Sequence, residues 1–317
     1  MKLAIVMDPL DTINIKKDST YAMIKEASRR NWQIFCCTVH DLYVDNSIPK
    51  AIFTEIIYTN NSNTNNKWYE ARQSINLDLR EVDIILLRKD PPVNLDYIYA
   101  TYILDLAKSY GTLVANDPTA VRSYNEKLST LNFPELIPPN LITTNKAKLL
   151  EFINNYKTII IKPLDGMGGR SIFKIEHGDA NTSVILDTMT DNGIEMVFAQ
   201  KYIPEITEGD KRIILINGEP ISYGLARIPA TGEIRGNLAA GAKGVGFELT
   251  KQDKLICEKI SPWLKSNKLF FVGIDVIGNY LTEINVTCPT CVQEIGAIFG
   301  CDISSEYLNF LESYLHL

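Results

Sequence analysis

The sequence of 317 residues has no excess of basic side chains. Its 32 Lys and Arg residues are outnumbered by 38 Asp and Glu residues, and the formal net charge is -6 at pH 7. Proteins that bind nucleic acid or anionic membrane surfaces through their overall charge show the opposite balance. We therefore expect no nucleic-acid or membrane partner, and any anionic ligand must be met by basic residues placed locally.

Long apolar runs are also missing. The first run, Leu3 to Met7, ends at Asp8 and is too short for a signal peptide, and no stretch is long enough to cross a bilayer. These absences predict a cytoplasmic protein. A hydrophobic content of 45% and a charged content of 22% are those of an ordinary globular protein, whose length allows two or three domains.

Residue types used for zinc and redox chemistry are scarce. The sequence holds six cysteines and three histidines, and without a signal peptide we expect the cysteines to be reduced. Cys288 and Cys291 have the CxxC spacing of redox and zinc motifs. The other cysteines and histidines supply no second ligand pair at a matching spacing, so a redox or zinc function is the minor alternative.

Strands and helices alternate in the first third of the chain. Apolar runs predict strands at 3–7, 32–39, 82–87 and 112–115, with helices at 19–30 and 96–110. This alternation predicts a parallel sheet, whose ligands gather beyond the carboxyl ends of the strands. Arg88 and Lys89 follow the third strand, where they are placed to bind a substrate carboxylate, with a solvated turn as the alternative. The Asn-rich stretch 60–66 is predicted to be a polar surface loop.

The character of the chain changes near Pro118. We place a domain boundary at residue 122, which gives an N-terminal α/β domain (1–122) and a second domain (123–317). A short helical piece is predicted around Glu126 and Lys127. A helix at 145–156 and a strand at 158–162 follow, and the second domain is richer in strand patterns, with hairpin turns predicted at 165–169, 217–218 and 278–279.

A glycine-rich hairpin spans residues 158–175, T-I-I-I-K-P-L-D-G-M-G-G-R-S-I-F-K-I. Gly166, Gly168 and Gly169 allow backbone N–H groups to close around phosphate oxygens, and Lys162 adds a positive charge at the strand end. The pattern is neither a Walker A loop nor a Rossmann fingerprint, because a strand follows it instead of a helix. With Lys127 upstream, phosphate binding is favoured over a plain turn.

The stretch 227–246 is long, glycine-rich and made of small residues. It is either a disordered linker or a mobile lid, and Arg235, Asn237 and Lys243 favour a lid that closes on anions. Just before it, Arg212 and Arg227 are predicted to face each other across a hairpin.

Residues 270–290, F-F-V-G-I-D-V-I-G-N-Y-L-T-E-I-N-V-T-C-P-T, predict two apolar strands joined by a three-residue loop at 278–280. That loop places Asp275 opposite Glu283, and Asn285 lies on the same face as Glu283 because strand side chains repeat every two residues. Opposed carboxylates repel each other. A divalent cation that they share, with an added oxygen from Asn285, removes the repulsion. A solvated hairpin face is the alternative, but the flanking apolar residues favour a buried metal site.

These stretches resemble the ATP-grasp ligases and, within them, the bacterial glutathione synthetases. The resemblance spans essentially the whole chain. It is carried in order by M-D-P-L, L-L-R-K-D-P-P, N-E-K-L, I-K-P-L-D-G-M-G-G, G-D-K-R, L-A-R-I-P, R-G-N-L-A-A-G and L-T-E-I-N-V-T. It implies a parallel α/β pre-ATP-grasp domain followed by an α+β ATP-grasp domain with a mobile glycine-rich lid.

The activity implied by the resemblance is ATP-dependent ligation of γ-glutamylcysteine and glycine to glutathione through an acyl phosphate, in a cytoplasmic homotetramer. The implied cofactors are ATP and Mg²⁺, with Mn²⁺ as a substitute. Metal binding is implied for Asp275, Glu283 and Asn285, catalysis for Arg212, Arg227 and Arg235, and substrate binding for Arg88, Asn237, Thr287, Cys288 and Thr290. Nucleotide binding is implied for Lys127, Lys162, Gly166, Gly168, Gly169, Gln200, Tyr202 and Asp210. No general base is evident.

The sequence departs from the family pattern at two positions. Cys288 stands where the pattern has Ser, which weakens an expected substrate hydrogen bond, and Ala242 replaces a lid glycine.

Two other functions remain as alternatives. The second enzyme interpretation is an ATP-grasp ligase for another carboxylate and amine, such as a D-alanine pair. A non-catalytic nucleotide-binding protein is expected to lack a metal ligand, whereas Asp275, Glu283 and Asn285 are all present.

Overall fold

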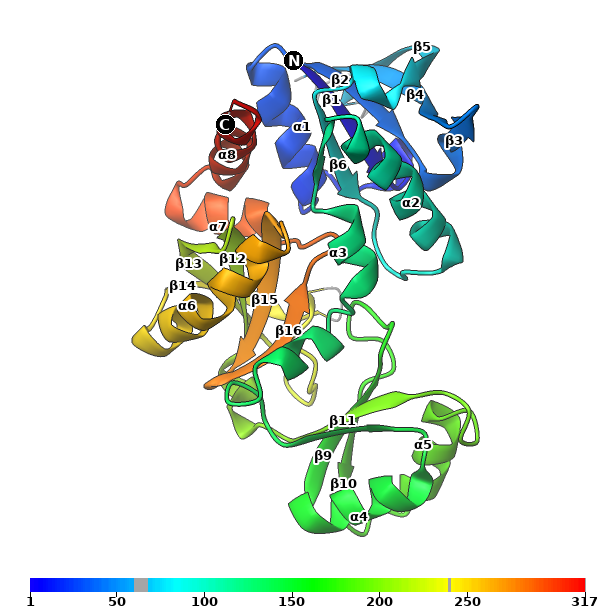
Figure 1. The fold of residues 1–317 in the computed structure, drawn as a ribbon. Helices are drawn as coiled ribbons and strands as arrows, with labels where there is room; N and C mark the ends of the chain where they lie inside the picture. Colours follow the sequence, from blue (N-terminus) through cyan, green and yellow to red (C-terminus); the bar gives the residue numbers. More distant parts are fainter. Residues whose placement is uncertain (60–67, 239–240, 317) are drawn as a thin grey trace.

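Three sheets follow one another along the chain in the computed structural model, which describes residues 1–59, 68–238 and 241–316. Figure 1 shows the seven-stranded N-terminal sheet at one end, the four-stranded sheet at the other, and the five-stranded C-terminal sheet between them. This mixed α/β architecture agrees with the predicted fold class. Among the described residues, no helix combines the length and apolar character that a membrane span requires.

The N-terminal sheet has the predicted parallel core. Its helices are α1 (Ser19–Arg29) and α2 (Leu95–Ser109), on opposite faces. Alternate residues of the first strand explain this, since Leu3 and Ile5 pack with α1, whereas Ala4 and Val6 pack with α2. The parallel strands are β1 (Lys2–Met7), β2 (Gln33–Cys37), β6 (Ile84–Arg88) and β7 (Leu113–Ala115).

The sheet also holds strands that were not predicted. Three antiparallel strands extend one side of it: β3 (Leu42–Asp45), β4 (Ile48–Tyr58) and β5 (Tyr69–Asp78). Most of β5 is exposed, and its polar sequence lacks the apolar run by which strands were recognised. The Asn-rich stretch 60–66, predicted as a loop between β4 and β5, lies outside the described residues.

The second sheet carries the glycine-rich hairpin. Its strands are β8 (Asn140–Thr143), β9 (Thr158–Pro163), β10 (Phe173–Glu176) and β11 (Val197–Lys201), in the order β10-β9-β11-β8. The antiparallel pairing of β9 with β10 confirms the predicted hairpin. Helices α4 (Lys146–Tyr156) and α5 (Thr182–Met189) cover the sheet, and its buried side chains form a cluster of their own.

The C-terminal sheet has the order β14-β13-β12-β15-β16. Its strands are β12 (Asp210–Ile216), β13 (Glu219–Ile228), β14 (Lys243–Glu248), β15 (Phe271–Ile277) and β16 (Tyr280–Asn285). Ile213 and Leu215 face α6 (Lys251–Ser266), whereas Ile214 belongs to the cluster that holds α7 (Val292–Phe299) and α8 (Ile303–Leu315).

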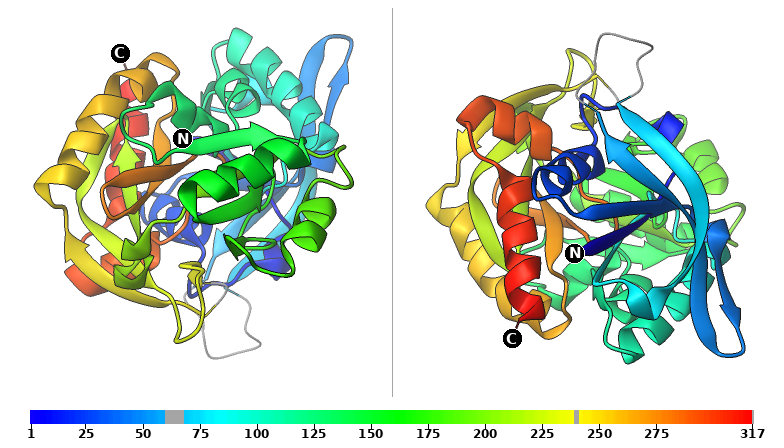
Figure 2. Two further views of the ribbon diagram at one scale, coloured as in Figure 1. Left: turned by 90° about the horizontal axis from the view of Figure 1, so that it is seen from below. Right: turned by 90° about the horizontal axis from the view of Figure 1, so that it is seen from above.

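One apolar cluster unites the N-terminal and C-terminal sheets. It contains Leu3 and Ile84 from the N-terminal sheet, Ile214 from the C-terminal sheet, and buried residues of α1, α7 and α8. Figure 2 shows α8 beside α1. Arg30, at the end of α1, adds polar contacts to α8: it hydrogen-bonds to Asn309 and forms an ion pair with Glu312 at 3.1 Å. The N-terminal and C-terminal sheets therefore share a core, whereas the four-stranded second sheet has a core of its own.

The link between the domains includes α3 (Pro118–Ser123). Before it, Asn116 donates to the carbonyls of Phe271 and Val286, both at 2.8 Å, and so ties the link to the C-terminal sheet. The short helical piece predicted around Glu126 and Lys127 is wrong for these two residues, which form a turn between α3 and the next helical turn. The turn is held by hydrogen bonds from the backbone to the Asn125 side chain.

The turn predicted at residues 278–280 is shorter than expected. Ile277 pairs with Tyr280, so the loop holds only Gly278 and Asn279. A two-residue loop alone would place Asp275 opposite Thr282, but an irregularity between Asp275 and Val276 shifts the register by one residue. Asp275 therefore lies opposite Glu283, as predicted. The cause is this irregularity in the strand and not a three-residue loop.

The start of α6 offers a test of local stability. Asp253 is fully buried, closes a capping box with Thr250 and pairs with Lys211 of β12. Replacing Asp253 with Ala removes the cap and leaves Lys211 without its partner, so we expect the free energy of unfolding to fall by about 3 kcal/mol. Lys254→Ala, an exposed change on the same helix, is the control, with an expected change within about 0.5 kcal/mol. Equal urea midpoints for the two variants would contradict this assignment.

Candidate functional site

Three cavities lie in a row between the sheets. The first, of about 790 Å³, lies among β9, β11, the glycine-rich loop (residues 164–172) and β16. The middle cavity, of about 830 Å³, shares Gly166, Gly168 and Glu283 with the first. The third cavity shares Cys288 and Thr290 with the middle one and reaches the carboxyl ends of the parallel strands.

The structure gathers the residues predicted for the site around these cavities. Those expected to bind nucleotide all line the first cavity: Lys127, Lys162, Gly166, Gly168, Gly169, Gln200, Tyr202 and Asp210. Arg235, Asn237, Asp275 and Glu283 line it as well. Arg212, Arg227, Asn285, Thr287, Cys288 and Thr290 line the middle cavity, and Arg88 lines the third. Lys243 joins none of these three walls, because it is exposed at the start of β14.

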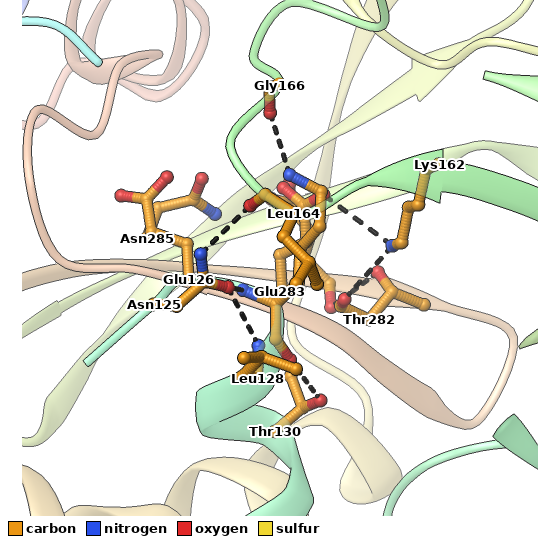
Figure 3. Close-up of polar contacts among 12 residues, drawn as sticks. Asn125, Glu126, Leu128, Thr130, Lys162, Leu164, Gly166, Thr282, Glu283 and Asn285 are labelled. Atoms are coloured by element: carbon orange, nitrogen blue, oxygen red, sulfur yellow. Dashed lines mark hydrogen bonds and ion pairs between the residues drawn. The ribbon is translucent and has the colours of Figure 1, made fainter. Parts of the chain in front are cut away.

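Two buried lysines converge on Glu283. The Nζ atoms of Lys127 and Lys162 lie 3.8 and 3.6 Å from its Oε1 atom. Lys127 also donates to the carbonyl of Gly166 at 2.7 Å, so it holds the glycine-rich loop. Figure 3 shows Lys162 directed toward Thr282 and Glu283. Burial lowers the pKa of Lys162, the change expected for an ammonium group removed from water.

A second charge cluster is centred on Asp275. Arg212 contacts both carboxylate oxygens, at 2.6 and 3.0 Å, and Arg227 lies 3.0 Å from Oδ2. Burial alone would raise the pKa of Asp275, but the two guanidinium groups outweigh it and hold the pKa well below its usual range. The prediction that Arg212 and Arg227 face each other was wrong in register, since Arg227 pairs with Asp210 and Arg212 with Leu225. The two arginines meet at Asp275 instead.

Asp210 has an unpaired oxygen in the first cavity. Its Oδ2 atom accepts from Arg227 at 2.6 Å, whereas Oδ1 is buried without a hydrogen-bond partner among the described residues. Burial raises the pKa of Asp210 to about 6 against the attraction of Arg227. An orphaned buried oxygen at a cavity wall is a position for a ligand donor or a cation.

The two opposed carboxylates do not by themselves require a metal. Asp275 is neutralised by Arg212 and Arg227, and Glu283 lies near two lysines. Within the described part of the chain, no three His, Cys, Asp or Glu side chains gather as metal ligands. The donor set still suits a hard cation, because Asn285 donates its amide N–H to the Gly273 carbonyl at 3.0 Å, which leaves its Oδ1 atom free beside Glu283.

The stretch 227–246 begins and ends as paired strands, since β13 runs to Ile228 and β14 starts at Lys243. The lid loop between them (residues 229–242, described except 239–240) packs on the glycine-rich loop. A Cβ atom on Gly169, whose φ is +78°, would lie 2.5 Å from Oδ1 of Asn237 and 3.3 Å from Cδ of Arg235. Only glycine allows this approach. The arrangement supports the lid interpretation over a linker.

Arg88 closes the side of the third cavity. It is buried, and it donates to Thr20 Oγ1 at 3.1 Å and to the Pro289 carbonyl at 3.0 Å. It therefore fixes the turn that carries Thr287, Cys288 and Thr290. Lys89, predicted alongside Arg88 to meet a carboxylate, is instead paired with Asp8 at 2.8 Å.

The CxxC pair shows no sign of redox use. All six cysteines, which lie in the described ranges, are free thiols. The Cys288 thiol contacts the Arg88 carbonyl at 3.3 Å, and burial raises its pKa, which disfavours the reactive thiolate. Cys291 is buried at the start of α7.

The residue that sequence reasoning missed is Glu126. Its Oε1 atom accepts three hydrogen bonds, from Val286 N at 3.0 Å, Thr287 N at 3.1 Å and Thr287 Oγ1 at 2.7 Å. Burial raises the pKa of Glu126. Only its position beside Lys127 in N-E-K-L marked it in the sequence, because its partners lie 160 residues away.

Comparisons with known proteins match the whole length of the chain. The family model described as the N-terminal domain of prokaryotic glutathione synthetase matches residues 1–122, and the model of its ATP-grasp domain matches residues 126–300. The glutathione synthetases of Vibrio vulnificus (strain CMCP6) and Escherichia coli O127:H6 are each 48% identical over 315 residues. These alignments cover 99% of this chain, and 98% and 99% of the respective relatives.

Solved structures give the same fold. D-cycloserine synthetase DcsG superposes with a TM-score of 0.68 at 12% identity, covering 99% of this chain and 100% of that one. The ATP-grasp ligase PsnB, complexed with a minimal precursor, Mg and ADP, has a TM-score of 0.63 at 12% identity, covering 100% of this chain and 98% of its own. The sequence relatives and the family models together show that the chain belongs to the prokaryotic glutathione synthetases of the ATP-grasp superfamily.

Proposed function

We propose that the ATP-dependent glutathione synthesis of this ligase takes place where its three cavities meet, with one substrate in each. The observation that carries this proposal is the row itself. The first and middle cavities share the glycine-rich loop and Glu283, and the middle and third share Cys288 and Thr290. Three substrates bound in this order place their reacting groups side by side, which is a large part of catalysis for such a reaction.

ATP occupies the first cavity in this proposal. Gly166, Gly168 and Gly169 present backbone to the phosphates, and Lys127 and Lys162 supply positive charge. Gln200 and Tyr202, at the end of β11, bound the opposite part of the same cavity, where the base would lie. The lid loop covers the phosphates through Arg235 and Asn237.

γ-Glutamylcysteine occupies the third cavity, with its cysteinyl carboxylate directed into the middle one. Arg88 and the turn 287–290 line this path. The carboxylate must approach the γ-phosphate, and the repulsion between two anions is the main barrier. Arg212 and Arg227 stand at the middle cavity to reduce it. The acyl phosphate formed there is then attacked by the amine of glycine, and phosphate leaves.

The oxygen donors of β15 and β16 suit Mg²⁺, or Mn²⁺ in its place. Glu283 and Asn285 would hold the ion, with Asp275 beside them. A bound ion would neutralise charge on the phosphates. This assignment leaves Lys127 and Lys162 to position the phosphate groups from the other side of Glu283.

The cellular compartment and the oligomeric state of the enzyme belong to the same proposal. Free cysteines in all six positions suit the reducing cytoplasm. A homotetramer is proposed from the resemblance to the family.

The first prediction from this proposed function tests the substrates. Phosphate release from ATP should require γ-glutamylcysteine and glycine together, and glutathione should form in equal amount. Each substrate is omitted in turn, and D-alanine is offered alone as the competing amine and acid. Equal phosphate release with D-alanine would overturn the proposed function in favour of the other ligase.

The second prediction concerns Glu283. Glu283→Gln keeps the shape but removes a charge that faces two lysines and a proposed cation. We expect turnover at saturating Mg²⁺ to fall at least about a hundredfold. Glu176→Gln, an exposed change on β10, serves as the control and should leave turnover unchanged. Near-normal turnover of Glu283→Gln would refute its place in the site.

The third prediction concerns the lid loop. Protease should cut the free protein within 229–242, and ATP with γ-glutamylcysteine should slow the cut, because an ordered lid hides its backbone. The fragments are identified by mass spectrometry. Cutting at another exposed loop, such as 190–195 after α5, provides the internal control and should not change. Equal cutting of the lid loop in both states would contradict closure.

A further inference from the structure

The middle cavity contains an acidic group without a counterion. Asp210, Asp275 and Glu283 each lie within ion-pair distance of a Lys or Arg. Glu126 also lines this cavity, yet no Lys, Arg or His in the described ranges forms an ion pair with it. A carboxylate left unpaired beside a cavity is a site for a cationic partner.

The two oxygens of Glu126 are in different situations. Oε1 is saturated by three donors from Val286 and Thr287. Oε2 receives no hydrogen bond from any described residue, and Glu126 is a partly exposed residue that lines the middle cavity. The bonds to Oε1 fix the carboxyl group in orientation and leave Oε2 as a preorganised acceptor.

The position of Glu126 in the row of cavities identifies the partner. It lines the middle cavity and neither of the other two, and this cavity lies between the one proposed for ATP and the one proposed for the peptide. Asp90, the other carboxylate of the middle cavity that forms no ion pair with a described residue, also lines the third cavity and therefore lies on the peptide side. The remaining substrate is an amino acid, whose ammonium group is the cation that must come closest to the acyl phosphate.

We propose that Glu126 binds the ammonium group of the incoming glycine through Oε2 and orients its nitrogen toward the acyl carbon. This inference rests on the proposed function, since it assumes that the acyl phosphate forms in the middle cavity. The role is a binding one: the ammonium group releases one proton to solvent, and the amine then attacks the acyl carbon. The new C–N bond replaces the C–O bond to phosphate, which leaves with the electron pair and takes up the second proton lost by the nitrogen.

The test separates ammonium binding from support of the 286–287 backbone. In Glu126→Gln, the amide oxygen can still accept the three hydrogen bonds at Oε1, but the charge at Oε2 is lost. We expect the KM for glycine to rise at least about tenfold, as for loss of a hydrogen bond to a charged group. The KM values for ATP and γ-glutamylcysteine should stay within about twofold. Glu135→Gln, an exposed change on the same linking segment, is the matched control.

Hydroxylamine supplies the second readout. It is uncharged at neutral pH and traps an acyl phosphate as the hydroxamate, so it needs no carboxylate to bind an ammonium group. Hydroxamate formation from ATP and γ-glutamylcysteine should therefore be the same in wild type and in Glu126→Gln. An equal fall with glycine and with hydroxylamine would show that Glu126 acts only through the backbone it holds, and would overturn the proposal.

Different results would overturn the proposed function and the proposed role of Glu126. Absence of both glutathione and hydroxamate in the wild type would overturn the proposed function and this inference with it. Normal glutathione synthesis by the wild type with an unchanged glycine KM in Glu126→Gln would overturn this inference alone. Glu126→Ala, which also loses the bonds to Val286 and Thr287, should lower the thermal midpoint, whereas Glu126→Gln should not.

Discussion

The site depends on charge balance among groups that are removed from water. Asp275 is almost wholly buried, and it is held between two guanidinium groups that are buried as well. Charges of this kind are stabilising only when each has its partners, because desolvation costs more than a single contact returns. Arg212 and Arg227 come from different strands, β12 and β13, so their shared carboxylate ties both strands to β15, of which only β12 is the direct neighbour. The charge balance of the candidate site and the geometry of the sheet thus rest on the same contacts.

Much of the architecture could be predicted from the sequence, because it rests on local patterns. The alternating strands and helices of the first domain follow from apolar periodicity, and α1 begins at Ser19, where the pattern places it. β5 escaped prediction because it is an exposed strand, stabilised by its pairing with β4 rather than by burial. A strand of that kind leaves no apolar signature to detect.

The candidate site divides in a similar way. Lys162, Gly169 and Glu283 stand in stretches whose spacing indicates their chemistry, and the structure gathers them at one cavity. The facing of Asp275 and Glu283 was predicted from a loop that is one residue too long, and an irregularity beside Asp275 restores the register. Such irregularities depend on both strands and cannot be seen in either sequence alone. Glu126 was missed for the same reason, because its role arises only from contacts across 160 residues.

The separate core of the second sheet has a mechanical consequence. Its buried residues all come from 149–199, whereas the N-terminal and C-terminal sheets are joined through the cluster around α1, α7 and α8. The first cavity has one wall on each of these two bodies. A nucleotide bound there would contact both parts, so part of its binding energy would favour one angle between the second sheet and the two joined sheets. The cavity proposed for the peptide lies apart from the second sheet, with Arg88 and the turn 287–290 held together by a hydrogen bond, so a change in that angle would leave its shape intact.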